Sequence, residues 1–112
     1  MLFAIPCVKE ELCMHFGHCE QFALVEIDDE SKSINKVAMH YPPPHQPGLL
    51  PKWLGERGVN IVIAGGMGGR AREIFNENNI EVITGATSGT PEKLVMEYLN
   101  GTLETGENVC DH

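Results

Sequence analysis

A proline-rich segment near the middle of the chain separates two halves with different hydrophobic periodicity. Residues 42–48 read Pro-Pro-Pro-His-Gln-Pro-Gly, and this segment cannot continue a β-ladder because proline has no N–H to donate. Strand-like runs precede it, whereas helical and strand-like runs alternate after it. The sequence therefore predicts an α/β fold in which a strand-only half is followed by strand–helix–strand units.

Three strands are predicted before the connector. Residues 2–8 form a continuous apolar run, typical of a central strand buried on both faces. After a loop over residues 9–18, a second strand covers residues 21–27. A third strand covers residues 34–41, where Val37, Met39 and Tyr41 share one face and Lys36, Ala38 and His40 share the other. Short turns between these runs predict an antiparallel meander.

The second half is predicted to alternate helices and strands. Strands are expected at residues 59–64 and 80–83, with helices near residues 50–54 and 71–75. A last helix begins at Thr90-Pro91, a typical N-cap and first helical residue, and ends at Gly101. Right-handed crossovers then make these strands parallel. The predicted order is βββαβαβα, a five-stranded mixed sheet covered by helices, with residues 1–101 as one domain and residues 102–112 as a flexible tail.

Charge and cysteine content narrow the function. The 112 residues carry 16 Asp+Glu against 8 scattered Lys+Arg, a net charge of −8, which disfavours nucleic acid and anionic membranes. The apolar runs are too short for a membrane span or a secretory signal. We therefore expect a cytoplasmic protein whose four cysteines are thiols.

A short segment rich in cysteine and histidine is the first candidate metal site. Cys13, His15, His18 and Cys19 lie within seven residues, and Gly17 allows the backbone to turn tightly between the histidines. Thiolate and imidazole are the ligands that zinc, copper and iron–sulfur clusters prefer. The spacing matches no standard zinc finger, and a solvated loop with a buried Cys19 remains the alternative.

A glycine-rich turn is the second candidate. It follows a predicted strand, opens a helix and consists of Gly65, Gly66, Met67, Gly68 and Gly69. Helix-start amides can hold an anion, although the glycines could equally serve close packing alone. We expect Gly66 or Gly68 to take a positive φ or to let the backbone approach a ligand. A dinucleotide site is rejected, because the chain is short and Thr84-Gly85 replaces the expected acid.

Two further segments could contribute to a site. His45 lies in the proline-rich connector and is a candidate contact to a cofactor, although a lone loop histidine is usually only exposed. Cys110 and His112 could fold over a cluster, or they could belong to a disordered terminus. Neither a nucleophile elbow with a Ser-His-Asp order nor a P-loop is present, so the sequence predicts a protein that is not an enzyme.

Several motifs together resemble one known family. They are His15-Phe16-Gly17, Ala64-Gly65-Gly66-Met67-Gly68 with Ala71, Ile80-Glu81-Val82 with Gly85, Tyr98-Leu99-Asn100-Gly101-Thr102-Leu103, and Cys110-Asp111-His112. In order and spacing the chain resembles the dinitrogenase iron–molybdenum cofactor biosynthesis family. The resemblance implies a three-layer ribonuclease H-like fold without nuclease activity. It also implies binding or carrying of iron–molybdenum cofactor, its precursors or related molybdenum- or iron-containing sulfide clusters, with a cluster-donor or acceptor protein as a partner. The family is associated with nitrogen fixation, but the resemblance does not by itself assign this chain to that process.

Three functions follow from these observations. The first is a non-catalytic cluster carrier or scaffold that uses His15, His18 and Cys19, with Cys13, Cys110 and His112 as further ligands. The second is a regulatory module that binds a small molecule or anion at the glycine-rich turn. The third is a protein–protein adaptor in which the cysteines and histidines are incidental.

Overall fold

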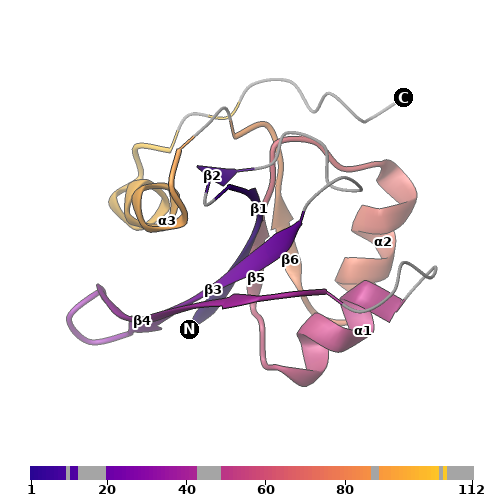
Figure 1. Cartoon of the computed structure of the whole chain (residues 1–112), viewed down its shortest axis with the longest axis horizontal. Helices are drawn as coiled ribbons and strands as arrows, with labels where there is room; N and C mark the ends of the chain where they lie inside the picture. The colour runs from indigo at the N-terminus through magenta and orange to yellow at the C-terminus, as the bar shows by residue number, and fades with distance from the viewer. Residues whose placement is uncertain (10, 13–19, 43–48, 87–88, 104, 106–112) are drawn as a thin grey trace.

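The computed structural model describes residues 1–9, 11–12, 20–42, 49–86, 89–103 and 105. Its elements follow one another along the chain as shown in Figure 1: β1 (Leu2–Val8), β2 (Glu11–Leu12), β3 (Gln21–Asp28), β4 (Ser33–His40), α1 (Leu49–Glu56), β5 (Ile61–Ile63), α2 (Gly69–Glu77), β6 (Glu81–Ile83) and α3 (Pro91–Asn100).

One mixed sheet forms the middle layer. Its strand order is β4-β3-β1-β5-β6, and β2 pairs with the end of β1. The strand β1 runs antiparallel to β3 and parallel to β5, and β5 runs parallel to β6. The α/β class, the central position of β1 and the mixed sheet are confirmed.

The predicted number of five strands is wrong, because the described part of the sheet has six. The additional strand is β2, which lies within the predicted loop over residues 9–18. Only Glu11 and Leu12 belong to it, opposite Val8 and Cys7 of β1. A two-residue strand is too short to show periodicity, so pairing with β1 defines it.

The helices cover the two faces of the sheet. In Figure 1, α3 lies on one side, and α1 and α2 lie on the other. Phe3 and Ile5 of β1 point to the α3 side and pack with Leu94, whereas Ala4 packs on the opposite side with Phe75. Because side chains alternate along a strand, β1 is buried on both faces, which is why its sequence is apolar without interruption.

A bulge in β4 changes the alternation within that strand. Lys36 pairs with Glu26 and Ile34 pairs with Ile27, which leaves Asn35 as an extra residue. The extra residue brings Ile34 to the α3 side, together with Met39, where both pack against the core. The predicted shared face of Val37 and Met39 is confirmed, since their partners Val25 and Ala23 belong to the same core cluster.

The predicted ends of α3 are confirmed. Thr90 is its N-cap, and its hydroxyl oxygen accepts a 3.3 Å hydrogen bond from the N–H of Lys93. Gly101 follows the helix with φ 74°, the left-handed conformation that favours glycine. Beyond it, Leu103 packs against the core and Thr105 forms an antiparallel bridge with Ala86. The mobility expected for the rest of the tail concerns residues outside the described ones.

Candidate functional site

The segments that contain the predicted site residues are attached to the sheet at one of its ends. The strands β1, β4, β5 and β6 end there and β3 begins there, because β1 is parallel to β5 and antiparallel to β3. We call this end of the sheet the ligand rim. The glycine-rich turn leaves it after β5, and the proline-rich connector leaves it after β4 (Figure 1).

The segment that holds residues 13–19 has both of its ends attached to Cys7. On one side, Leu12 is the register partner of Cys7 in the β1–β2 pair. On the other side, the N–H of Glu20 donates a 2.9 Å hydrogen bond to the carbonyl oxygen of Cys7. The seven residues between them therefore leave and re-enter the sheet at one point of the ligand rim.

The glycine-rich turn passes from the core to the surface. Gly65, Gly66 and Met67 are buried, whereas Gly69 is exposed at the start of α2. Gly68 is the N-cap residue with φ −65° and ψ 153°, and its carbonyl oxygen accepts the N–H of Arg72. The N–H groups that precede this bond have no acceptor within the helix, and such groups can bind an anion.

The expectation of a positive φ at Gly66 or Gly68 is wrong. Among the described glycines, only Gly58, Gly85, Gly89 and Gly101 have a positive φ. Gly68 adopts the extended backbone of an ordinary N-cap, which residues with a side chain also adopt. Any requirement for glycine here must come from close approach of the backbone to other groups.

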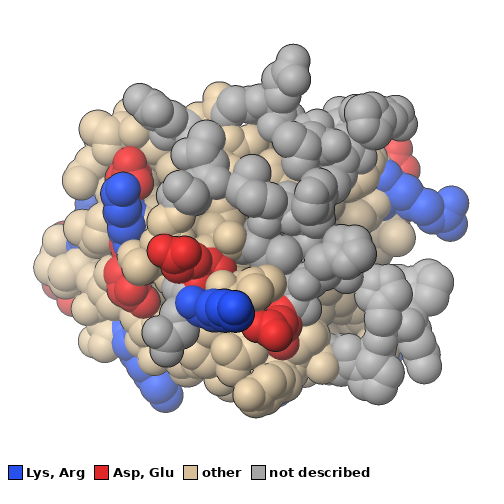
Figure 2. Space-filling view, turned by 45° about the horizontal axis from the view of Figure 1, so that its top comes forward, with Lys and Arg blue, Asp and Glu red and all other residues tan. Residues whose placement is uncertain are grey.

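Positive charge lies at the start of α2. Its first turn has no acidic residue, and Arg70 is exposed while Arg72 is half-buried. Helices more often carry acids at this end, because the helix dipole is positive there. In Figure 2, which brings the top of the molecule forward, the described acidic and basic atoms are interspersed on the visible face. Although the chain has a net charge of −8, the start of α2 carries two positive side chains and no acidic residue in its first turn.

Backbone hydrogen bonds connect the ligand rim segments to one another. The N–H of Gly85, just after β6, donates to the carbonyl of Gly65 at 2.8 Å, and Ala86 donates to Ala64 at 3.3 Å. Ala86 also forms the bridge to Thr105, so the C-terminal segment is attached beside the glycine-rich turn. Sequence reasoning missed this attachment, because a single bridge has no periodic signature.

The predicted metal ligands fall outside the described residues. Cys13, His15, His18, Cys19, Cys110 and His112 are not described, and neither is His45, the predicted cofactor contact. Within the described part of the chain, no group of three or more His, Cys, Asp or Glu side chains is arranged to hold a metal ion. Of the predicted site, the structure thus places the residues of the glycine-rich turn.

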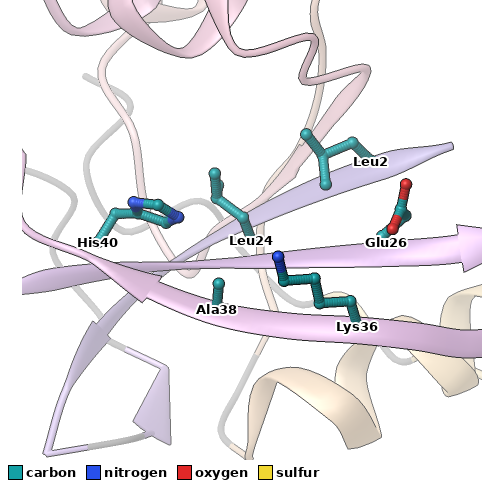
Figure 3. Close-up of a pocket in the computed structure, with 6 residues that line it drawn as sticks. All are labelled: Leu2, Leu24, Glu26, Lys36, Ala38 and His40. Atoms are coloured by element: carbon teal, nitrogen blue, oxygen red, sulfur yellow. The ribbon is translucent and has the colours of Figure 1, made fainter.

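A groove lies on the sheet face that α1 and α2 only partly cover. Figure 3 shows this groove, which has a volume of about 190 Å³ and is lined by Leu2, Leu24, Glu26, Lys36, Ala38 and His40. Lys36 and Glu26 are cross-strand partners at its mouth. The polar lining of the groove thus consists of one carboxylate, one ammonium group and one imidazole.

His40 has a structural role at one end of this groove. It is half-buried, and its ring meets that of Trp53 edge-on with the ring centroids 6.4 Å apart. Trp53 in turn lies beneath the guanidinium of Arg57, 4.5 Å from the ring centroid. These contacts attach α1 to β4, so His40 contributes to packing in this part of the structure.

Among the described residues, no helix combines the length and the apolar character needed to span a bilayer.

The model of the dinitrogenase iron–molybdenum cofactor family matches residues 1–101. An uncharacterised protein of Methanocaldococcus jannaschii, MJ0580, is 30% identical to the chain over 114 residues, with 96% of this chain and 92% of that protein aligned.

Solved structures show the same fold. The crystal structure of PH0822 superimposes with a TM-score of 0.84 at 30% identity and covers 96% of this chain and 98% of its own. MJ0327 of Methanocaldococcus jannaschii, described as a candidate dinitrogenase, superimposes with a TM-score of 0.75 at 19% identity and covers 96% of each chain. The match over residues 1–101 and the related sequences show that this chain belongs to the dinitrogenase iron–molybdenum cofactor family.

Proposed function

We propose that this protein binds and carries a metal–sulfide cluster related to iron–molybdenum cofactor, as cargo and without catalysing a reaction. Membership of the family over residues 1–101 supports a role connected with that cofactor. The observation that carries the proposal is that two segments are attached to the sheet at the ligand rim. The segment with His15, His18 and Cys19 is attached at Cys7, and the glycine-rich turn begins on the neighbouring parallel strand.

The two segments supply complementary chemistry. Thiolate and imidazole bind the metals of a sulfide cluster directly, so we assign the core ligands to His15, His18 and Cys19 and a further one to Cys13. The amides at the start of α2, together with Arg70, stabilise the negative charge of the cluster. Three strong protein ligands leave coordination positions open, which suits a carrier that must release its cargo.

The C-terminal segment can contribute from the same rim. Thr105 is held against Ala86, and five further residues extend over at most about 17 Å. That length allows Cys110 and His112 to reach a cluster at the glycine-rich turn, so we propose them as additional ligands. His45 is proposed as a further contact, because its connector leaves the same rim after β4.

Three finer assignments accompany this proposal. With β2 set aside, we assign the strand order β4-β3-β1-β5-β6 to the ribonuclease H-like class. We place the protein in the cytoplasm, where a reducing environment keeps thiols free for metal. A carrier also needs a protein that delivers the cluster and one that receives it, in nitrogen fixation or in another pathway that uses such clusters.

Anaerobic reconstitution with iron, molybdate and sulfide tests the proposal. We expect wild-type protein to retain a coloured cluster after gel filtration, with metal and acid-labile sulfide in fixed proportion to protein. A His15→Ala, His18→Ala, Cys19→Ala triple variant should lose most of this metal while its circular dichroism is unchanged. His40→Ala is the matched control, since that histidine contacts Trp53. Equal metal uptake by the triple variant and wild type would place the site elsewhere.

A further inference from the structure

The outer edge of β4 is free of a strand partner in the described part of the chain. In the strand order β4-β3-β1-β5-β6, β4 is terminal and pairs only with β3. It is one of the two longest strands, with eight residues from Ser33 to His40. In Figure 1 it runs along the margin of the sheet. Unpaired N–H and C=O groups on such an edge can pair with another strand.

Two exposed apolar side chains accompany this edge. Val37 is 37% exposed and Tyr41 is 77% exposed; the third exposed large hydrophobic residue among those described is Met1. Val37 faces the α3 side of the sheet, as Met39 does, because its partner Val25 belongs to that core cluster. Tyr41 directly follows His40, the last residue of β4, and continuing the alternation of the strand by one residue would place Tyr41 on the same side. Two exposed apolar side chains, those of Val37 and Tyr41, therefore lie along or next to the free edge.

We propose that β4 pairs antiparallel with β4 of a second copy of this chain about a two-fold axis at Met39. In this register Val37 lies opposite the partner's Tyr41, and Tyr41 lies opposite the partner's Val37, because the two residues are equally distant from Met39. Aromatic and β-branched residues form favourable cross-strand pairs. An isologous contact of this kind closes on itself and gives a dimer.

The sequence of β4 disfavours the neighbouring registers. An axis at Ala38 would place Lys36 opposite the partner's His40, a polar pair that lacks the apolar contact between Val37 and Tyr41. An axis at Val37 would place Met39 opposite the partner's Asn35, the residue at which the strand bulges. In the Met39 register, Ala38 faces the partner's His40 and no charged side chains oppose one another within residues 37–41.

The bulge and the prolines also set the length of the contact. Asn35 interrupts regular pairing on one side, and Pro42 lacks an N–H on the other. The contact is thereby confined to residues 37–41, so its area is small and the dimer is weak. Each copy has a net charge of −8; because salt screens the repulsion between copies, association should strengthen as ionic strength rises.

Sedimentation velocity over a concentration series measures this association. We expect the full-length wild type to change from monomer to dimer as concentration rises, more readily at 0.5 M than at about 0.05 M salt. A Val37→Thr, Tyr41→Ser double variant should weaken the dimer at least about tenfold. Glu81→Gln, on β6 at the opposite edge, is the control and should dimerise at least as well as wild type. A dimer that is unchanged in the double variant would overturn the proposal.

Disulfide crosslinking tests the register. Val37→Cys and Tyr41→Cys are placed separately in a background in which Cys13, Cys19 and Cys110 are replaced by Ser, leaving Cys7 buried. On oxidation, an equimolar mixture should form the mixed disulfide dimer in preference to either variant alone, because each new thiol faces the other position. Crosslinking of the single variants at the same rate as the mixture, or a chain that remains monomeric at every concentration and salt, would refute this pairing.

Discussion

The backbone N–H of Leu12 donates a 3.0 Å hydrogen bond to the carbonyl oxygen of Gly89. This bond connects β2, near the N-terminal end of the chain, to the residue that precedes the N-cap of α3. Gly89 has φ 138°, a conformation that residues with a Cβ rarely adopt. The contact thus joins two segments of the ligand rim through a backbone geometry that requires glycine.

Replacing Gly89 by Ala should destabilise the protein. The native φ of 138° is strained for a residue with a Cβ, whereas the added Cβ would make only an ordinary contact with Lys93 Cδ at 3.6 Å. We therefore expect the backbone strain to cost about 1–3 kcal/mol in the free energy of unfolding. Gly55→Ala is the opposite case: it lies in α1, and its Cβ would meet its nearest neighbour at 3.9 Å. That substitution should stabilise by about 0.5–1 kcal/mol. Urea denaturation measures both, and the same sign for both would contradict the explanation.

Substitution of Gly68 should separate helix capping from cargo binding. Because Gly68 already has N-cap geometry, Asp at this position can cap α2 and keep the melting temperature at or above that of wild type. Its negative charge would repel an anionic cluster, so we expect affinity for the reconstituted cluster to fall at least about tenfold. Gly68→Ser adds a similar cap without the charge and should bind the cluster more tightly than the Asp variant. Equal affinities for Ser and Asp would remove the glycine-rich turn from the site.

The contribution of the Thr90 N-cap to the free energy of unfolding should be measurable separately. Thr90→Ala removes the hydroxyl that accepts the N–H of Lys93, and we expect a loss of about 1 kcal/mol in the free energy of unfolding. Thr90→Ser retains the acceptor and should stay close to wild type. If Ser and Ala proved equally destabilising, the contribution of Thr90 would come from its methyl group and not from capping.

Asp28 should make a pH-dependent contribution to stability at the turn between β3 and β4. A hydrogen bond from the N–H of Glu30, 3.0 Å from the carboxylate, and another from Ser31 lower the pKa of Asp28 below its ordinary value of 3.8. A lowered pKa means that folding favours the ionised form. The stabilisation is therefore complete above the unfolded-state pKa and is lost as pH falls through the folded-state pKa.

The substitution Asp28→Asn tests the predicted direction of this pH dependence of stability. The variant should be less stable than wild type at neutral pH, and the difference should shrink as pH falls below about 3.8. Chemical denaturation at a series of pH values gives the comparison. Glu77→Gln, which removes one negative charge from α2, controls for net charge. A difference between wild type and Asp28→Asn that stays constant down to pH 2 would show that the carboxylate does not act through its ionisation.

The sequence by itself determined the elements that have local signatures. The apolar run of residues 2–8 identified a strand buried on both faces, because only such a strand avoids alternating with polar residues. Thr90-Pro91 and Gly101 fixed the ends of α3, since capping depends on side chains and φ values within a few residues. The motifs in order and spacing also identified the family. In each case the information is local or consists of order along the chain.

Only the tertiary structure decided the features that depend on distant partners. The strand β2 exists because Leu12 meets Cys7 and Gly89, and the position of Ile34 depends on how β4 pairs with β3. The bridge between Ala86 and Thr105 likewise joins two segments, and the sequence of neither segment predicts this pairing. Predicted ligands such as His15 and Cys19 stay predictions, whereas the rim to which their segment is attached is defined. Long-range hydrogen bonding sets these positions, and a single sequence carries no periodic signal for it.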